Sequence, residues 1–140
     1  MEMTLAIVKP DAVSARNAGK VLAFLEEKGF EIRGLRKLRL SQEQARAFYA
    51  VHKERPFYGS LVEFMTSGPV VPVALARDNA VAYLREVMGA TDVAKAEPGT
   101  IRNLFGTSIE RNAIHGSDSA ENAAVELAFF FSQAERIAAL

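Results

Sequence analysis

Short apolar or alternating runs of residues predict four β-strands along the chain. In the second run the apolar phase slips after Ile32, and Gly34 at the slip indicates a β-bulge. Pro72 lies inside the third run and favours an irregular or edge position, because proline cannot donate to a strand ladder. The predicted strands are Thr4–Val8, Phe30–Leu40, Val70–Ala76 and Val125–Phe131.

Apolar residues at helical spacing predict helices between these strands. The first helix is expected to end at Gly29, since glycine accepts the left-handed conformation that follows many helices. Ser41 and Gln44 have the spacing of a capping box. The other predicted helix starts are Pro56, Asp78 or Asn79, and Asp118 or Ser119.

The order of the elements predicts an α+β fold. Strand, helix, strand, helices, strand, helix, strand is the order of a ferredoxin-like βαββαβ sandwich, with a four-stranded antiparallel sheet of order 4-1-3-2 covered by helices. The segment Gly89–Ile114 shows little periodicity, and a long loop of this kind is expected to be functional. With no linker or repeat, residues 1–140 are expected to form a single domain.

Composition excludes several classes of protein. Apolar residues make up 49% of the chain, enough for a core, and the 17 basic and 17 acidic side chains balance. A net charge of zero gives no general attraction to nucleic acid or anionic membranes. The absence of cysteine excludes disulfides and thiolate chemistry. No apolar run approaches a signal peptide or a membrane span, so a cytoplasmic protein is expected.

Three cationic side chains are candidates for phosphate binding. No phosphate-binding glycine loop is present, so phosphate would be bound by side chains. Lys9, Arg85 and Arg102 each lie in or beside a loop, where guanidinium and ammonium groups can bind phosphate oxygens. The alternative is that each of them is a solvated surface charge.

His115 is the sharper candidate, because it lies among small polar residues that a core would not select. Gly116 would leave room for a substrate beside the ring, and Asn112 can donate a hydrogen bond to a sugar or phosphate oxygen. Glu126 could hold the far ring nitrogen and fix the tautomer. The alternatives are a structural histidine, and a Glu126 on the solvent face of its strand. The other histidine, His52, is expected to end a helix at the surface, and no role is assigned to it.

Two further segments allow more than one interpretation. Phe57 follows Pro56 outside the periodic segments, where its ring could stack on a nucleobase, but a core position is favoured from the residues alone. The basic strand "RGLRKLR" could bind nucleic acid, although an exposed strand face protected from aggregation is preferred.

Six segments in the same order resemble the nucleoside diphosphate kinase family, across almost the whole chain. They are "VKPDAV", "FYAVHKERPF", "LVEFMTSGPV", "MGATD", "PGTIR" and "RNAIHGSDSAENAAVEL". The stretch "NAIHGSD" matches the active-site signature of that family. The resemblance implies transfer of the γ-phosphoryl group of ATP, GTP or another nucleoside triphosphate to a nucleoside diphosphate, in two steps through a phosphohistidine.

The resemblance also assigns roles to residues of this chain. It implies that His115 is the nucleophile, that Lys9 reaches the sugar 3′-hydroxyl and the transferring phosphate, and that Mg²⁺ arrives on the phosphates with few or no protein ligands. Its supporting residues would be Tyr49 beside the lysine, Glu126 on the histidine and Ser117 on the glutamate. Its nucleotide ligands would be Phe57 and Ile109 on the base, Arg85, Thr91 and Arg102 on the phosphates, and Asn112 at the sugar.

The resemblance implies an oligomer but does not decide its size. Family members form dimers that associate into tetramers or hexamers, and Phe30–Leu40 is expected to form the dimer interface because an edge strand leaves backbone groups unpaired. The family often has a proline where Val93 stands, which concerns loop rigidity and subunit contacts. Tetramer and hexamer therefore both remain possible.

Two other functions compete with the phosphotransferase. A nucleotide- or nucleic-acid-binding module without catalysis would be expected to lack the lysine or the histidine, and both Lys9 and His115 are present. A histidine phosphatase typically has an arginine directly before the histidine, where this chain has Ile114.

Overall fold

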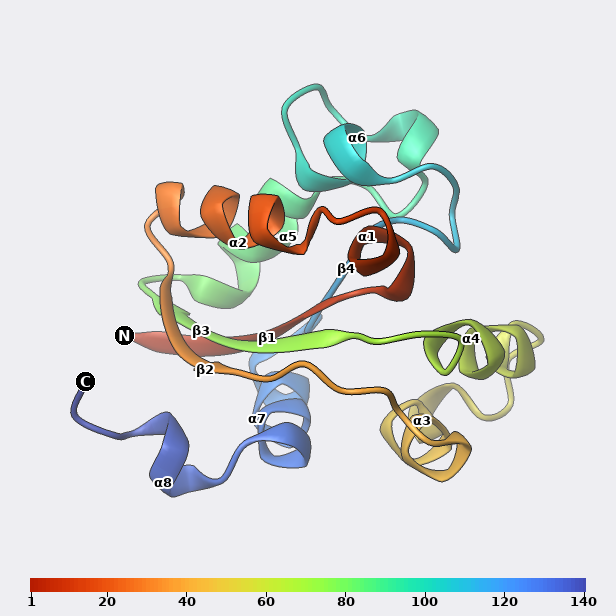
Figure 1. Cartoon of the computed structure of the whole chain (residues 1–140). Helices are drawn as coiled ribbons and strands as arrows, with labels where there is room; N and C mark the ends of the chain where they lie inside the picture. The colour runs from red at the N-terminus through yellow and green to blue at the C-terminus, as the bar shows by residue number, and fades with distance from the viewer.

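A four-stranded antiparallel sheet of order β2-β3-β1-β4 runs through the middle of the computed structural model, which describes residues 1–140 (Figure 1). This confirms the expected ferredoxin-like sheet, in which the chain order 4-1-3-2 places the second and fourth strands at the edges. The strands are β1 (Glu2–Val8), β2 (Glu31–Leu35), β3 (Val71–Arg77) and β4 (Ile114–Gly116).

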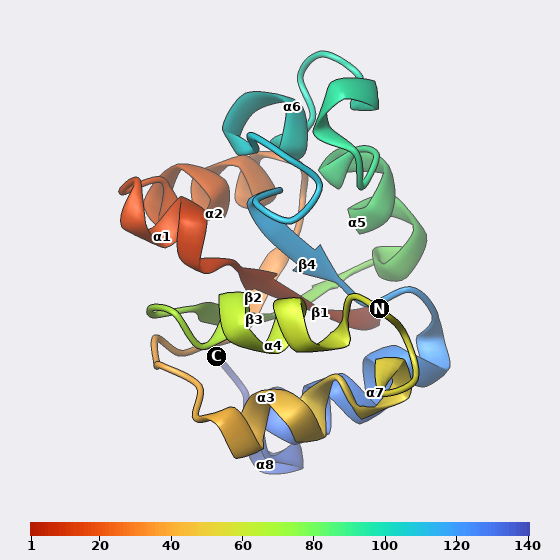
Figure 2. The same ribbon diagram turned by 90° about the vertical axis from the view of Figure 1, so that its right-hand side faces the viewer.

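Helices cover both faces of the sheet (Figures 1 and 2). One face carries α1 (Pro10–Ser14), α2 (Ala18–Glu27), α5 (Ala80–Met88) and α6 (Ile101–Phe105). The other carries α3 (Gln42–Phe48), α4 (Tyr58–Met65), α7 (Ala120–Phe130) and α8 (Gln133–Arg136). Two short 3-10 helices complete the chain, η1 (Ala50–His52) and η2 (Val93–Lys95). None of the helices is long and apolar enough to cross a membrane.

Strand β1 is buried on both faces. Ala6 and Val8 belong to the core under α2 and α5, whereas Leu5 and Ile7 belong to the core over α3, α4 and α7. The strand pairs with β3 along its whole length and with β4 at its end. The last residues of β1 are thus paired with a strand on each side and packed against helices on each face. This fixes the point at which Lys9 leaves the sheet.

The edge strand β2 is shorter than the sequence predicts, because regular pairing stops at Leu35 and continues only as an isolated bridge at Leu38. The expected bulge is confirmed, since the register with β3 shifts between Ile32 and Gly34. Pro72 was expected at an irregular or edge position, and this is wrong. It lies in the central strand β3, near its beginning, and its carbonyl oxygen still accepts a hydrogen bond from the Arg36 amide.

The predicted strand Val125–Phe131 is also wrong, because all of these residues but Phe131 form the last turns of helix α7 and the outer strand is instead Ile114–Gly116. Ser119 caps the helix by accepting a hydrogen bond from the Asn122 amide. Ala123, Leu127 and Phe130 then face the core at helical spacing. The exposed Val125 and Phe129 add apolar residues between these positions and hide that periodicity.

Local helix signals in the sequence are largely confirmed. Ser41 and Gln44 form the reciprocal capping box at the start of α3. Gly29 follows α2 with φ +86°, which glycine adopts without strain. Asn79 precedes α5 in a left-handed conformation, without a side-chain cap. The expected loop Gly89–Ile114 contains η2 and α6, so it is less irregular than predicted.

Gly34 generates a stability prediction, because a Cβ atom there would lie 2.9 Å from Cδ1 of the buried Phe131. We expect Gly34→Ala to lower the free energy of unfolding by about 1–3 kcal/mol, as overpacking of a core does. Urea unfolding at fixed protein concentration measures the change. Gly19→Ala is the control, since the helical Gly19 has open space around it and should tolerate alanine. A Gly34→Ala chain as stable as the parent would show that the packing is not restrictive.

Candidate active site

His115 lies at the centre of strand β4, and a carboxylate from another element fixes its ring. Its Nε2 lies 2.7 Å from Oε1 of Glu126, which projects from helix α7. The same Oε1 accepts a hydrogen bond from the Ser117 hydroxyl, at 2.9 Å. Ser117 is fully buried, and the His115 and Glu126 side chains are 20% and 18% exposed. The carboxylate is thus held in one place and orients the imidazole.

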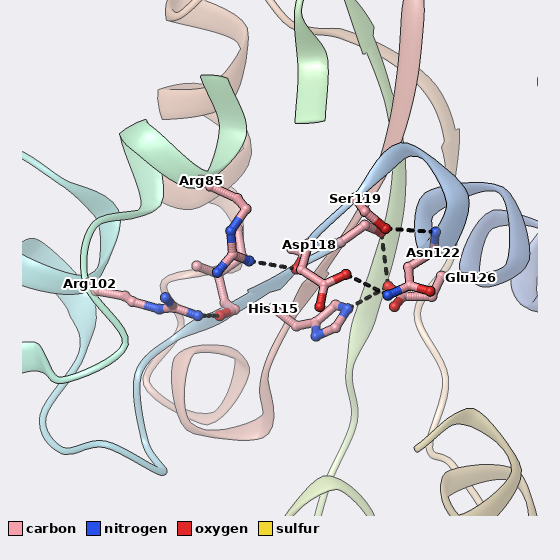
Figure 3. A network of polar contacts seen from close by, with 10 residues as sticks. Arg85, Arg102, His115, Asp118, Ser119, Asn122 and Glu126 are labelled. Carbon is pink, nitrogen blue, oxygen red and sulfur yellow. Dashed lines mark hydrogen bonds and ion pairs between the residues drawn. The ribbon is translucent and has the colours of Figure 1, made fainter. Parts of the chain in front are cut away.

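This contact determines which nitrogen of His115 is free to react. A carboxylate accepts hydrogen bonds, so the proton of a neutral ring lies on Nε2 and Nδ1 keeps its lone pair. Nδ1 has no hydrogen-bond partner in the chain, and the ring directs it away from Glu126 (Figure 3). Placing Glu126 on a strand was wrong, but the predicted contact between its carboxylate and the ring is present.

Two aromatic rings limit the movement of the imidazole. The Phe48 ring meets the His115 ring edge-on with centroids 5.5 Å apart, and the Tyr49 ring does so at 6.1 Å. Tyr49 is buried, and its burial, together with the nearby Glu126, raises the pKa of its hydroxyl. The phenol therefore keeps its proton and can donate it in a hydrogen bond to an anion.

Lys9 follows β1 directly, and only 7% of its surface is exposed. Its ammonium group donates to Oδ1 of Asn112 at 2.9 Å and to the Glu110 carbonyl oxygen at 3.2 Å. Burial, with a contribution from Arg102, lowers the pKa of Lys9 to about 8. Asn112 also donates from Nδ2 to the Thr91 carbonyl oxygen. In this structure the asparagine thus holds the lysine and the loop at Thr91.

Arg102 is a second buried cation, 7% exposed, on the short helix α6. Its guanidinium donates to the carbonyl oxygens of Ile114, at 2.8 Å, and Gly89, at 3.1 Å, while its Nε atom has no partner. Burial and the neighbouring Arg85 lower the pKa of Arg102 to about 10. Arg85 is exposed on α5 and donates to the Gly116 carbonyl oxygen (Figure 3).

No carboxylate forms an ion pair with any of these three cations, although Asp11 and Glu110 lie near enough to Lys9 to raise its pKa in part. The ion pairs of the structure are Glu31 with Arg33, Arg36 with Glu135 and His115 with Glu126. A buried charge without a counter-ion is unfavourable unless an anion joins it. The positive charge of Lys9, Arg85 and Arg102 therefore favours a polyanionic ligand. The surface-charge alternative fails for Lys9 and Arg102, because both are buried, and Arg85 alone is exposed.

A cavity of about 370 Å³ brings most of the predicted residues together. Predicted residues that line it are Lys9, Tyr49, Arg85, Thr91, Arg102, Asn112, His115 and Glu126. Ser117 lies behind Glu126 and does not line it. Lining residues that the sequence analysis left without a role are Val51, His52, Leu61, Asp118 and Asn122. Asp118 belongs to the "NAIHGSD" stretch and Asn122 lies one turn later, so the position of this motif could have identified both as residues of the site.

Phe57 and Ile109 stand outside this cavity. Phe57 is 47% exposed before the start of α4, so the core position favoured from the residues alone is wrong. Ile109 is 60% exposed in the loop before Asn112. The Ser60 hydroxyl on α4 donates to the carboxylate of Glu110 at 2.6 Å. The two apolar side chains are thus presented by segments that contact each other.

Two residues have surroundings that differ from the expectations. Gly116 was expected to leave room for a substrate, and it does line the cavity, but a Cβ atom there would also lie 2.5 Å from Sδ of Met88. The glycine is therefore required by the packing of β4 against α5. His52 ends η1 as expected, yet it lies in the cavity wall rather than on an open surface. Its ring stacks on Tyr49, with centroids 6.4 Å apart, and lies tilted against Phe57, with centroids 5.4 Å apart.

Asp118 and Glu126 are the carboxylates that line the cavity. Glu126 is occupied by His115 and Ser117, and nowhere in the chain do three or more histidine or acidic side chains gather as a metal-binding group. A hydrogen bond from Asn122, at 2.5 Å, lowers the pKa of Asp118 and keeps its carboxylate ionised (Figure 3). Asp118 is therefore the side chain here that could contact a cation carried by a ligand.

Comparison with known proteins places the chain among enzymes of one kind. The family model described as nucleoside diphosphate kinase matches residues 2–136. The nucleoside diphosphate kinase of Geobacter sp. (strain M21) is 56% identical over 137 residues, which cover 98% of this chain and 100% of the relative. The nucleoside diphosphate kinase of Chlorobaculum tepidum is 58% identical over 135 residues, with 96% of each chain covered.

Solved structures give the same result. A crystal structure of the Aquifex aeolicus nucleoside diphosphate kinase superposes with a TM-score of 0.94, at 47% identity, over 97% of this chain and 99% of the other. The nucleoside diphosphate kinase of Encephalitozoon cuniculi also gives a TM-score of 0.94, at 32% identity, over 99% of this chain and 95% of the other. Sequence and architecture agree over almost the full length, and the chain belongs to the nucleoside diphosphate kinase family.

Proposed function

We propose that His115 carries the phosphoryl group in the reaction of this family. Family membership makes the chain a phosphotransferase, which moves the γ-phosphoryl group of a nucleoside triphosphate to a nucleoside diphosphate in two half-reactions. The observation that carries the residue assignment is the single free nitrogen of His115, Nδ1, in a cavity lined by cations without counter-ions. We also propose that residues 1–140 act as one such domain, in the cytoplasm.

In the first half-reaction the lone pair of Nδ1 attacks the γ-phosphorus, and the bond from that phosphorus to the bridging oxygen breaks. The diphosphate leaves with the electron pair of that bond. The imidazole becomes positively charged as the N–P bond forms, and the carboxylate of Glu126 stabilises this charge through the hydrogen bond on Nε2. A second nucleoside diphosphate then takes the phosphoryl group from Nδ1 by the reverse of this step.

The cations provide most of the catalysis in this scheme. Phosphoryl transfer has a loose transition state, so positioning and charge stabilisation dominate. Lys9 and Arg102 are held by hydrogen bonds to carbonyl and amide oxygens before the ligand arrives, so little reorganisation is needed. Tyr49 stays protonated and can donate to the transferring group, while Arg85 and Thr91 bind the phosphates that leave.

The family uses a divalent cation, and we propose that Mg²⁺ enters on the phosphates of the nucleotide. When bound, the ion would offset the negative charge of the phosphate oxygens. Asp118, which also accepts a hydrogen bond from Asn122, would be the carboxylate to hold the ion from the protein side, directly or through a water molecule. For the base we propose a slot between Phe57 and Ile109, in which Asn112 lies towards the sugar. Apolar faces of this kind accept purines and pyrimidines alike.

We further propose a dimer built across β2. This strand is at the sheet edge with no neighbour on its outer side, and Leu35 on it is 51% exposed. Pairing with β2 of a second copy would satisfy the free backbone groups. Val93 packs near Gly106 in the long loop, which would mediate association of dimers into a tetramer or hexamer. Nucleic acid and membranes have no place in this proposal.

The phosphohistidine is tested by intact mass. Incubation with ATP and Mg²⁺ should add one phosphoryl group to the chain, and added nucleoside diphosphate should remove it. His115→Gln should add none while still binding nucleotide, since Lys9, Arg85 and Arg102 remain. Full phosphorylation of His115→Gln would overturn the assignment. Rapid loss of the group without an acceptor would indicate a phosphatase, and no gain by the parent chain would indicate a binding module.

The lowered pKa of Lys9 generates a pH prediction. The value is about 8, so the ammonium group loses its proton at a pH where an ordinary lysine is still charged. We expect kcat/KM for the triphosphate, which reports the free enzyme, to fall as the pH rises above about 8. Lys9→Arg, although less active, should lose this descending limb because guanidinium stays charged. A parent profile that is flat up to pH 10 would contradict the prediction.

The dimer prediction is tested at Leu35. Leu35→Lys would place a further positive charge beside Arg36 and Lys37 on each side of a two-fold axis, and should shift the population towards the 15.3 kDa monomer. Sedimentation velocity at micromolar concentration measures this. Val125→Lys is the control, because Val125 is 70% exposed on α7, away from the β2 edge. If the parent chain were a monomer, or Leu35→Lys changed nothing, the interface would be wrong.

A further inference from the structure

The two walls of the base slot are carried by segments that touch through one hydrogen bond. One wall is Phe57, which directly precedes α4, and the other is Ile109, in the loop 106–111. Ser60 in the first turn of α4 donates from Oγ to Oε2 of Glu110, at 2.6 Å. Ser60 is three residues from Phe57, and Glu110 is the neighbour of Ile109. The contact therefore joins the two segments that carry the walls.

The loop that carries Ile109 is closed by its own backbone. The amides of Thr107 and Ser108 both donate to the Arg111 carbonyl oxygen, and the Arg111 amide donates to the Ser108 hydroxyl. This arrangement leaves Ile109 and Glu110 together at the tip. Since the loop is a compact unit, the hydrogen bond of Glu110 acts on the position of Ile109 as well.

Glu110 also contacts the phosphate side of the site, because its carbonyl oxygen accepts from Lys9 at 3.2 Å. Lys9 has a shorter hydrogen bond to Asn112, at 2.9 Å, which does not involve the loop tip. The phosphate side thus keeps its principal support if the loop tip moves. The base side is less firmly held, since Ile109 is 60% exposed and Phe57, 47% exposed, rests on the His52 ring.

We propose that Ser60 and Glu110 are positioning residues whose hydrogen bond sets the width of the base slot. The inference rests on the proposed slot between Phe57 and Ile109. A hydrogen bond between the segments that carry its walls preorganises the slot for a planar base, so that less conformational entropy is lost on binding. Without the bond, base binding is weaker while phosphate binding is kept. The bond therefore affects nucleotide affinity and not the attack by Nδ1 of His115.

The test compares a ligand with a base and one without. Isothermal titration with ADP and with inorganic pyrophosphate, each with Mg²⁺, gives the two dissociation constants. Ser60→Ala and Glu110→Ala should bind ADP about three- to tenfold more weakly, as expected for one charge-assisted hydrogen bond. Ser60→Ala keeps the carboxylate of Glu110 near Lys9 and should bind pyrophosphate as the parent does. Ser60→Thr keeps the hydroxyl and should restore ADP affinity.

Two control variants separate the effect of the Ser60–Glu110 hydrogen bond, here called the latch, from the effects of neighbouring side chains. Glu63→Ala removes an exposed carboxylate from the same helix, with no side-chain hydrogen bond to lose, and should leave both constants unchanged. Phe57→Ala removes one wall and should weaken ADP binding. Unchanged ADP affinity in Ser60→Ala beside weakened Phe57→Ala would overturn the latch and leave the slot standing. Equal weakening of ADP and pyrophosphate in Ser60→Ala would also overturn it. Unchanged affinity in Phe57→Ala would overturn the slot itself, and the latch with it.

Discussion

Two cations are buried beside the sheet without an ion pair to any carboxylate, and the site is organised around that unfavourable burial. Lys9 and Arg102 are each 7% exposed, and their hydrogen bonds go to carbonyl and amide oxygens. Neutral acceptors fix the direction of each charge but do not cancel it. The positive field therefore remains available to the phosphates. The burial of these charges lowers the stability of the fold and raises the affinity for phosphates, a common compromise at functional sites.

The fold supplies those acceptors from several distant segments. Asn112 and the Glu110 carbonyl oxygen come from the loop before β4, and the Gly89 carbonyl oxygen comes from the end of α5. His115 lies on the strand and Glu126 on the following helix, so a single strand-to-helix turn carries both members of the pair. Helices on both faces of the sheet are needed, because one face brings Arg85 and Arg102 and the other brings Tyr49 and Glu126.

Much of this could be predicted from the sequence, because local signals and motifs survive without tertiary context. The Ser41 cap, Gly29 and the Gly34 bulge follow from local stereochemistry, and the pairing of His115 with Glu126 followed from chemistry and family resemblance. The helical state of Val125–Phe131 was missed, because two exposed apolar residues masked the buried spacing. The reason for Gly116 was missed because its neighbour, Met88, is distant in sequence.

The register of strand β1 fixes the position of Lys9 relative to His115. Its alternate side chains fill two different cores, so a slip of one residue would place Leu5 and Ile7 where Ala6 and Val8 belong. Pairing with β3 on one side and β4 on the other opposes the same slip, since Val8 is opposite both Val71 and Ile114. The distance from the lysine ammonium group to the histidine ring is therefore set by the packing of residues that never meet a nucleotide. Substitutions deep in either core can change catalysis without touching the site.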